Sequence, residues 1–312
     1  MTKGIHHITA IASDAIETVH FYTKILGLRL VKKTVNQDDP ETYHLFFGDR
    51  LGHPGMDLTF FIFLPAMQGK IGTGLVSKIS LAVPESALQF WLERFQHYKV
   101  RHEEIEELCG KKRVSFFDKD GQCLELVGLS QDEFDSELDL WTAEVSEEHA
   151  IRNFYAATLS VVSIDAIEPV LTHVFGYKLH HTDGHIRQYV LSGSQRAQYL
   201  EVSEEPSAAP GFNAAGTVHH IAFRAKDAKQ QQTMRNAVLE LGLYPTEVIN
   251  RFYFQSVYFR TPAGILFEIA TDGPGFTADE DEVELGKQLS LPPFLQPHRE
   301  EIEKHLKPIP SE

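Results

Sequence analysis

Two histidines and a glutamate, far apart in the chain, have the types and positions expected of metal ligands. Glu268 stands between Phe267 and Ile269 in an apolar run typical of a strand, and a carboxylate buried there needs a cation or another partner. His7 and His220 each precede, by seven residues, an acidic residue suited to start a helix. Two imidazoles and one carboxylate, with further positions open, form the ligand set of non-haem Fe(II) oxygenases. The sequence predicts a metal held by His7, His220 and Glu268, with Fe(II) expected and Mn, Zn or Ni also compatible.

Each expected histidine ligand is directly preceded by a second histidine, His6 and His219 respectively. Because successive side chains of a strand point to opposite faces, we expect only one of each pair to bind metal directly. The helix spacing selects His7 and His220. Two roles stay open for His6 and His219: they support the ligands, or they are purely structural.

A repeated pattern of strand, helix and three further strands indicates how the chain is organised. The pattern occurs four times, with first strands that include His7, Lys78, Thr158 and His220. Such internal repeats fix the architecture. Modules of this kind cannot bury one sheet face alone, so they pair and curl around a cavity. We therefore predict an α+β fold of four βαβββ modules paired into two open barrels, with the site inside.

The expected domain boundaries follow from polar or glycine- and proline-rich linkers. Residues 1–135 are expected to hold a first pair of modules and residues 146–272 a second pair. Residues 273–312 differ in composition and are expected to form a tail, which either covers a pocket or packs as a strap on the surface.

Equivalent positions in the four modules show which pair of modules has the residues to bind a transition metal. Aligned on their expected helix starts, the positions equivalent to His7 are Lys78, Thr158 and His220. The equivalent positions in the last strands are Thr59, Glu125, Glu201 and Glu268. Modules one and four thus supply the full ligand set. A site between modules two and three, built on Glu125 and Glu201, is the less favoured alternative.

Charge and composition exclude several classes of protein. The formal net charge of -15 disfavours nucleic acids and anionic membranes as partners. The first residues lack a secretory pattern and no apolar run is long enough to cross a bilayer, so we expect a cytoplasmic protein. The two cysteines, Cys109 and Cys123, have no metal-binding or disulfide spacing and are expected to be plain buried thiols.

The modules and ligands together resemble the vicinal oxygen chelate superfamily, which includes glyoxalase I, extradiol ring-cleaving dioxygenases and bleomycin-resistance proteins. The segment YFRTPAGILFE, from Tyr258 to Glu268, is similar to the extradiol dioxygenase signature. The likeness is greater to the hydroquinone-cleaving branch, typified by 2,6-dichlorohydroquinone 1,2-dioxygenases, whose ligands come from the first and fourth modules. Arg251, seven residues before Tyr258, and Thr9, two residues after His7, match that branch. The histidine of catechol-cleaving enzymes is missing from residues 248–251.

This resemblance implies a ring-cleaving dioxygenase that takes a small hydroquinone-type aromatic and O2, with Fe(II) as cofactor. It implies that Tyr258 donates or relays a proton and that Arg251 stabilises negative charge. It further implies a homo-oligomer and a role in the breakdown of aromatic compounds. Two other functions stay open: a glyoxalase-like isomerase, disfavoured because Thr59 replaces a ligand glutamate, and a ligand-sequestering protein without chemistry, which needs no metal ligands.

Overall fold

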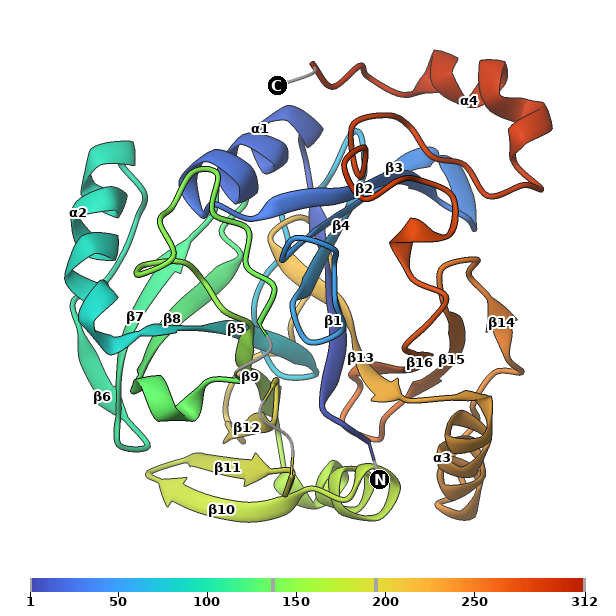
Figure 1. Ribbon diagram of the computed structural model, residues 1–312. Helices are drawn as coiled ribbons and strands as arrows, with labels where there is room; N and C mark the ends of the chain where they lie inside the picture. The colour runs from blue at the N-terminus through green and yellow to red at the C-terminus, as the bar shows by residue number, and fades with distance from the viewer. Residues whose placement is uncertain (1, 136–137, 194–195, 311–312) are drawn as a thin grey trace.

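Two curled, eight-stranded mixed sheets form the body of the molecule, with few helices outside them (Figure 1). The computed structural model describes residues 2–135, 138–193 and 196–310. Residues 1, 136–137, 194–195 and 311–312 lie outside this description, although the expected ranges and linkers include them. The predicted α+β fold of four βαβββ modules in two open barrels is confirmed. We call each curled sheet a half-barrel.

The first half-barrel combines modules one and four, in the strand order β14-β15-β16-β13-β1-β4-β3-β2. Its strands are β1 (Ile5–Ala12), β2 (Arg29–Asn36), β3 (Asp39–Gly48), β4 (Asp57–Ile62), β13 (Thr217–Ala225), β14 (Ile249–Asn250), β15 (Gln255–Arg260) and β16 (Leu266–Thr271).

The second half-barrel combines modules two and three, in the order β10-β11-β12-β9-β5-β8-β7-β6. Its strands are β5 (Leu75–Pro84), β6 (Glu106–Leu108), β7 (Lys111–Phe117), β8 (Cys123–Leu129), β9 (Phe154–Val161), β10 (Lys178–Asp183), β11 (Ile186–Val190) and β12 (Tyr199–Glu204).

This pairing corrects the expectation that consecutive modules within 1–135 and 146–272 form the pairs. The first strand of each module needs a partner for its open edge. In the second half-barrel β5 pairs with β9, and in the first β1 pairs with β13, both antiparallel. Modules two and three are neighbours in sequence, and their pairing leaves the outer modules to pair with each other. The boundaries at residues 135, 146 and 272 themselves stay a prediction.

Within the described residues, four α-helices lie outside the sheets. Asp14 caps the first, because its carboxylate accepts the backbone N–H groups of Ile16 and Glu17, and Asp227 caps the third in the same way. A π-helical turn, Phe21–Ile25, continues the first helix. The helices are α1 (Ala15–His20), α2 (Leu88–Tyr98), α3 (Ala228–Glu240) and α4 (Arg299–His305). In the part of the chain that the structure describes, none of them is long and apolar enough to cross a membrane.

The alignment of module three needs a correction of two residues. Parallel pairing places Thr9 beside Thr59 and Ala222 beside Glu268, and in module three it places Thr158 beside Glu201. Thr158 therefore matches Ala222, and the residue that matches His220 is Ala156. The helical segment of this module begins after Ser163, whose backbone is extended, and not at Asp165, on which the alignment was based. Module three still offers no histidine at the ligand position.

The tail crosses the outer part of the first half-barrel, over β2 and β3 (Figure 1). Lys32, which is completely buried, anchors it by ion pairs with Asp279 (2.8 Å) and Glu280 and by a hydrogen bond to the carbonyl oxygen of Phe276 (3.0 Å). The ring of Phe276 also packs on Phe46, with centroids 5.0 Å apart. The tail thus works as a strap and also covers aromatic side chains of the barrel.

Candidate metal centre

His7, His220 and Glu268 come together on three neighbouring strands, β1, β13 and β16, in the middle of the first half-barrel. The Nε2 atoms of the two histidines are 3.3 Å apart. Oε2 of Glu268 lies 3.2 Å from Nε2 of His7 and 3.0 Å from Nε2 of His220. All three side chains are buried. The structure thus gathers the three residues selected from the sequence into one triangle of ligand-type atoms.

The dimensions and chemistry of this triangle fit a metal ion. With metal–ligand bonds of about 2.1 Å, adjacent ligand atoms are roughly 3.0 Å apart at right angles and roughly 3.4 Å apart in a tetrahedron. Apart from the two histidines, neither oxygen of Glu268 has a polar partner among the described residues, although the carboxylate is completely buried. Burial by itself would raise the pKa of Glu268, but His7 and His220 hold it well below its usual value. A buried carboxylate kept ionised needs a cation.

His6 holds the ligand His7 in one tautomer. The register of β1 against β13 shifts between Ile5 and His7, which leaves His6 as an extra, bulged residue. Nε2 of His6 donates to the carbonyl oxygen of Thr271 (3.1 Å), so Nδ1 of His6 must accept from Nδ1–H of His7 (3.0 Å). Burial and the nearby His7 lower the pKa of His6 to about 3, which keeps this ring neutral. The lone pair of His7 Nε2 is therefore presented to the metal position.

A matching contact lies on the other side of the centre. A second register shift, at Thr9 and Ala10 of β1, leaves His219 as the extra residue on β13. Nδ1 of His219 is 2.8 Å from Nδ1 of His220. Burial and His220 lower the pKa of His219 to about 3. The bulges explain how both members of each histidine pair act at one site, although neighbouring strand residues ordinarily face apart.

Thr9 belongs to a polar chain on the wall next to the centre. Its hydroxyl lies 2.8 Å from that of Thr59, which is 2.9 Å from Nε2 of His44. Phe46 and Phe61 hold the His44 ring, with centroids 4.0 and 4.4 Å away. Burial and the nearby His7 keep the pKa of His44 well below its usual value. Thr59, at the position of a fourth metal ligand in glyoxalases, is thus engaged in orienting His44.

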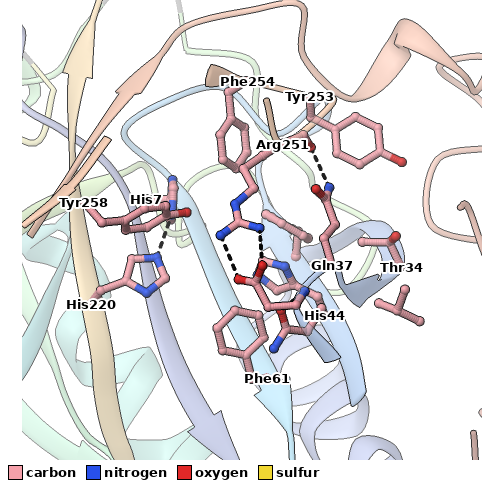
Figure 2. Close-up of a pocket in the computed structure, with 14 residues that line it drawn as sticks. His7, Thr34, Gln37, His44, Phe61, His220, Arg251, Tyr253, Phe254 and Tyr258 are labelled. Atoms are coloured by element: carbon pink, nitrogen blue, oxygen red, sulfur yellow. Dashed lines mark hydrogen bonds and ion pairs between the residues drawn. The ribbon is translucent and has the colours of Figure 1, made fainter. Parts of the chain in front are cut away.

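Tyr258 and Arg251 form the facing wall of the pocket, and Figure 2 shows them with His7, His220 and His44. Tyr258 packs edge-on against His220, and the Arg251 guanidinium lies 5.4 Å from the Tyr258 ring centroid. Both Nη atoms of Arg251 donate to Asp38 of the β2–β3 turn, at 3.0 and 2.8 Å. Burial and the charge of Glu268 raise the pKa of Tyr258, so the phenol keeps its proton at neutral pH. The structure therefore places a protonated phenol and a guanidinium held by Asp38 beside the centre.

Sequence reasoning missed the part that module one contributes to the pocket rim. Asp38 fixes Arg251, and Nε2 of Gln37 donates to the backbone oxygen of Arg251 (2.8 Å). Nothing in their sequence neighbourhood marks these two residues, because the contact depends on how the half-barrel curls. His44 carried a weak signal, since it lies in a strand of the module that supplies His7.

The second half-barrel fills the corresponding position with protein cations. Arg113, completely buried, donates to Glu125 (3.0 Å) and to Glu201 (2.7 Å), and Lys78 Nζ lies 2.9 Å from Glu125. Two positive charges balance two negative ones. Glu125 and Glu201 are therefore committed to ion pairs, which disfavours the alternative site between modules two and three.

Comparison with known proteins identifies the family of the chain. The model of the Glyoxalase/Bleomycin resistance protein/Dioxygenase superfamily matches residues 4–126 and 145–269. A Bacillus subtilis protein provisionally named ring-cleaving dioxygenase MhqO is 41% identical over 309 residues, which cover 99% of this chain and 97% of that protein. The chlorohydroquinone/hydroquinone 1,2-dioxygenase of Sphingobium indicum is 33% identical over 307 residues, covering 96% of this chain and 94% of that enzyme.

Solved structures show the same fold. A crystal structure of a provisionally named dioxygenase from Bacillus subtilis superposes with a TM-score of 0.93 at 40% identity, covering 99% of this chain and 98% of that one. Glyoxalase I from Zea mays superposes with a TM-score of 0.65 at 15% identity, covering 86% of this chain and 92% of that one. At 15% identity, the likeness to glyoxalase I shows a shared fold and nothing about function.

Proposed function

The chain belongs to the Glyoxalase/Bleomycin resistance protein/Dioxygenase superfamily, and on that basis we propose that it is an Fe(II)-dependent dioxygenase that cleaves the ring of hydroquinone-type aromatics. The observation that carries the proposal is the buried triangle of His7, His220 and Glu268, which lies beside a pocket that also holds Tyr258 and Arg251. Two relatives of similar length support it, one named as a ring-cleaving dioxygenase and one as a chlorohydroquinone/hydroquinone 1,2-dioxygenase.

His7, His220 and Glu268 would hold the metal. Bound there, Fe(II) would lower the pKa of a substrate hydroxyl and bring the ionised ring and O2 together, which leaves the protein to orient the ring and to move protons. Both oxygen atoms of O2 enter the product, and the carbon–carbon bond beside the hydroxylated carbon breaks.

The chain's own residues divide the remaining work between the two walls. Tyr258, kept protonated, donates its phenol proton towards oxygen atoms that gain negative charge during the reaction. Arg251 carries a permanent charge and is fixed by Asp38, so it stabilises that negative charge without reorganising. His44, on the opposite wall, offers a neutral imidazole to the second hydroxyl of a para-diol. Phe61 and Phe254 supply apolar surface for the ring.

Oxygen uptake tests the proposal directly. Metal-free protein is reconstituted anaerobically with Fe(II), Zn(II) or Ni(II) and then given hydroquinone, methylhydroquinone or catechol. We expect iron-dependent uptake of one O2 per hydroquinone, a new ring-opened chromophore, and little uptake with catechol. Bound metal without oxygen uptake would favour the isomerase function, and a protein that binds no metal would favour the sequestering function. Either result would refute the proposed reaction.

A further inference from the structure

A second group of metal-ligand side chains lies at the mouth of the second half-barrel, away from the proposed active site. One ligand atom each from Cys109, His181 and Asp183 lies within 4.8 Å of the others. Cys109 belongs to the β6–β7 turn and the other two to β10. Strands β6 and β10 are the two edges of the same curled sheet, so the group joins the edges of an otherwise open half-barrel.

Local backbone features direct each residue towards this point. Cys109 has a φ of 52° and is followed by Gly110 at 70°, a two-residue turn in a conformation that favours Asn, Asp or Gly. A cysteine at this position is less favourable for the backbone than asparagine, aspartate or glycine would be. Its backbone N–H donates to Oδ2 of Asp183 (3.1 Å), which fixes the turn against β10.

A bulge in β10 turns the histidine to the inner face. The register against β11 shifts between Leu179 and His181, so His181 comes to lie opposite Gln188. Gln188 faces the interior, where it donates to Glu201 (3.0 Å). His181, beside Gln188 on that inner face, stays exposed because it stands at the edge.

The charges beneath the group are already balanced, so we expect a further cation to bind at the mouth of the second half-barrel and not in its interior. Arg113 and Lys78 neutralise Glu125 and Glu201 below. A thiolate at Cys109 and the carboxylate of Asp183 would together carry two negative charges, which match a divalent ion. Because a cysteine binds metal as the thiolate, the Cys109 thiol would release its proton to solvent when the ion binds.

The same place in the first half-barrel is closed by an ion pair. There the β2–β3 turn supplies Asp38 and the segment after β14 supplies Arg251. The β6–β7 turn and the end of β10 are the corresponding segments of modules two and three. In the second half-barrel, among the described residues, the backbone hydrogen bond from Cys109 to Asp183 takes the place of that ion pair, and the side chains of Cys109, His181 and Asp183 lie beside it.

We propose that Cys109, His181 and Asp183 bind one divalent cation of the zinc class, which clamps the edges of the second half-barrel together. One sulfur, one nitrogen and one oxygen ligand suit Zn(II) and exclude Mg(II) and Ca(II), which prefer all-oxygen sites. The expectation that Cys109 is a plain buried thiol missed this group, because Cys109 comes from module two whereas His181 and Asp183 come from module three. The inference does not depend on the proposed reaction.

Cobalt spectroscopy on the full-length protein tests the site, because only a sulfur ligand gives thiolate-to-cobalt charge transfer. We expect a near-ultraviolet charge-transfer band when Co(II) is added to the wild-type protein. The band disappears in Cys109→Ser and persists in the matched control Cys123→Ser, since Cys123 is buried in β8. His7, His220 and Glu268 contain no sulfur and contribute nothing to this band. Absence of the band, or its survival in Cys109→Ser, would overturn the proposal.

Zinc binding gives a second measurement. Glu268→Ala, which removes a ligand of the first site, is expected to bind one zinc through the second group, whereas Glu268→Ala/Cys109→Ser binds none. Zinc should also slow the reaction of Cys109 with a thiol-specific disulfide reagent by at least about tenfold. If zinc gives no protection in the wild type, or if both variants bind equal zinc, the clamp does not exist.

Discussion

The hydrogen bonds of His6 predict a specific loss of metal affinity when that ring can no longer form them. In His6→Phe the ring shape is kept and can still pack on Phe254, whose centroid lies 5.3 Å from that of His6. The variant loses the bond to the Thr271 carbonyl and the acceptor for His7 Nδ1–H. His7 is then free to move its proton to Nε2, where it blocks the metal position. Removal of such outer partners typically weakens metal binding by about 10–100-fold, or roughly 1.4–2.7 kcal/mol.

The assay is anaerobic competition of Fe(II) or Zn(II) between the protein and a chromophoric chelator. The matched control is His219→Phe, expected to lose less affinity because His219 is only half-buried and, among the described residues, no bond corresponding to that between His6 and Thr271 anchors it. Thermal unfolding of the metal-free proteins checks that both variants fold. A loss below about threefold in His6→Phe would show that the His6–His7 contact does not set the tautomer, and would refute the reasoning.

Four further changes probe other parts of the structure. Glu268→Ala should abolish iron binding at the triangle, because it removes the negative charge, and metal analysis after desalting of the iron-reconstituted protein checks this. Tyr258→Phe should keep stoichiometric iron and lower kcat by about 10²–10⁴-fold; full turnover would remove Tyr258 from the mechanism. His44→Phe should raise KM for hydroquinone more than it lowers iron affinity, as measured by oxygen uptake beside chelator competition, and equal effects would indicate a structural role only. Burial raises the pKa of Asp118 to about 6, above its unfolded value of about 3.9. Protonated Asp118 therefore makes its full contribution to the free energy of unfolding below about pH 4. That contribution, at most about 3 kcal/mol, is lost as the pH rises through 6. Asp118→Asn should thus gain stability relative to wild type at pH 7.5 but not at pH 4, as urea unfolding will show.

The repeated modules and the three expected ligands could be predicted from sequence because both rest on local patterns. Strand and helix periodicity is local, and a histidine at the same offset before a helix start can be compared between modules. The alignment failed in module three, where Asp165 resembles a cap although the chain uses Ser163. Register, in contrast, is decided by pairing between strands, which a single segment does not encode.

The remaining features depend on contacts between modules. The bulges at His6 and His219 exist only in the ladder between β1 and β13. The Asp38–Arg251 pair and the Cys109 group each depend on how a half-barrel curls until its edges meet. The partner of each module was also not predictable from chain order, since the first strand pairs with the module farthest from it in sequence.

The pairing of the first module with the last sets the order of events during biosynthesis. Glu268 follows His7 by 261 residues, which a ribosome adds in roughly 13–50 s at 5–20 residues per second. For most of that interval, until β13 (Thr217–Ala225) has been made, one edge of β1 has no partner, whereas β5 can pair with β9 as soon as residue 161 has been added. The nascent chain must therefore keep an apolar strand edge from aggregating until β13 emerges. The three proposed ligands are all present only when the chain is almost finished, so the proposed metal would be loaded late.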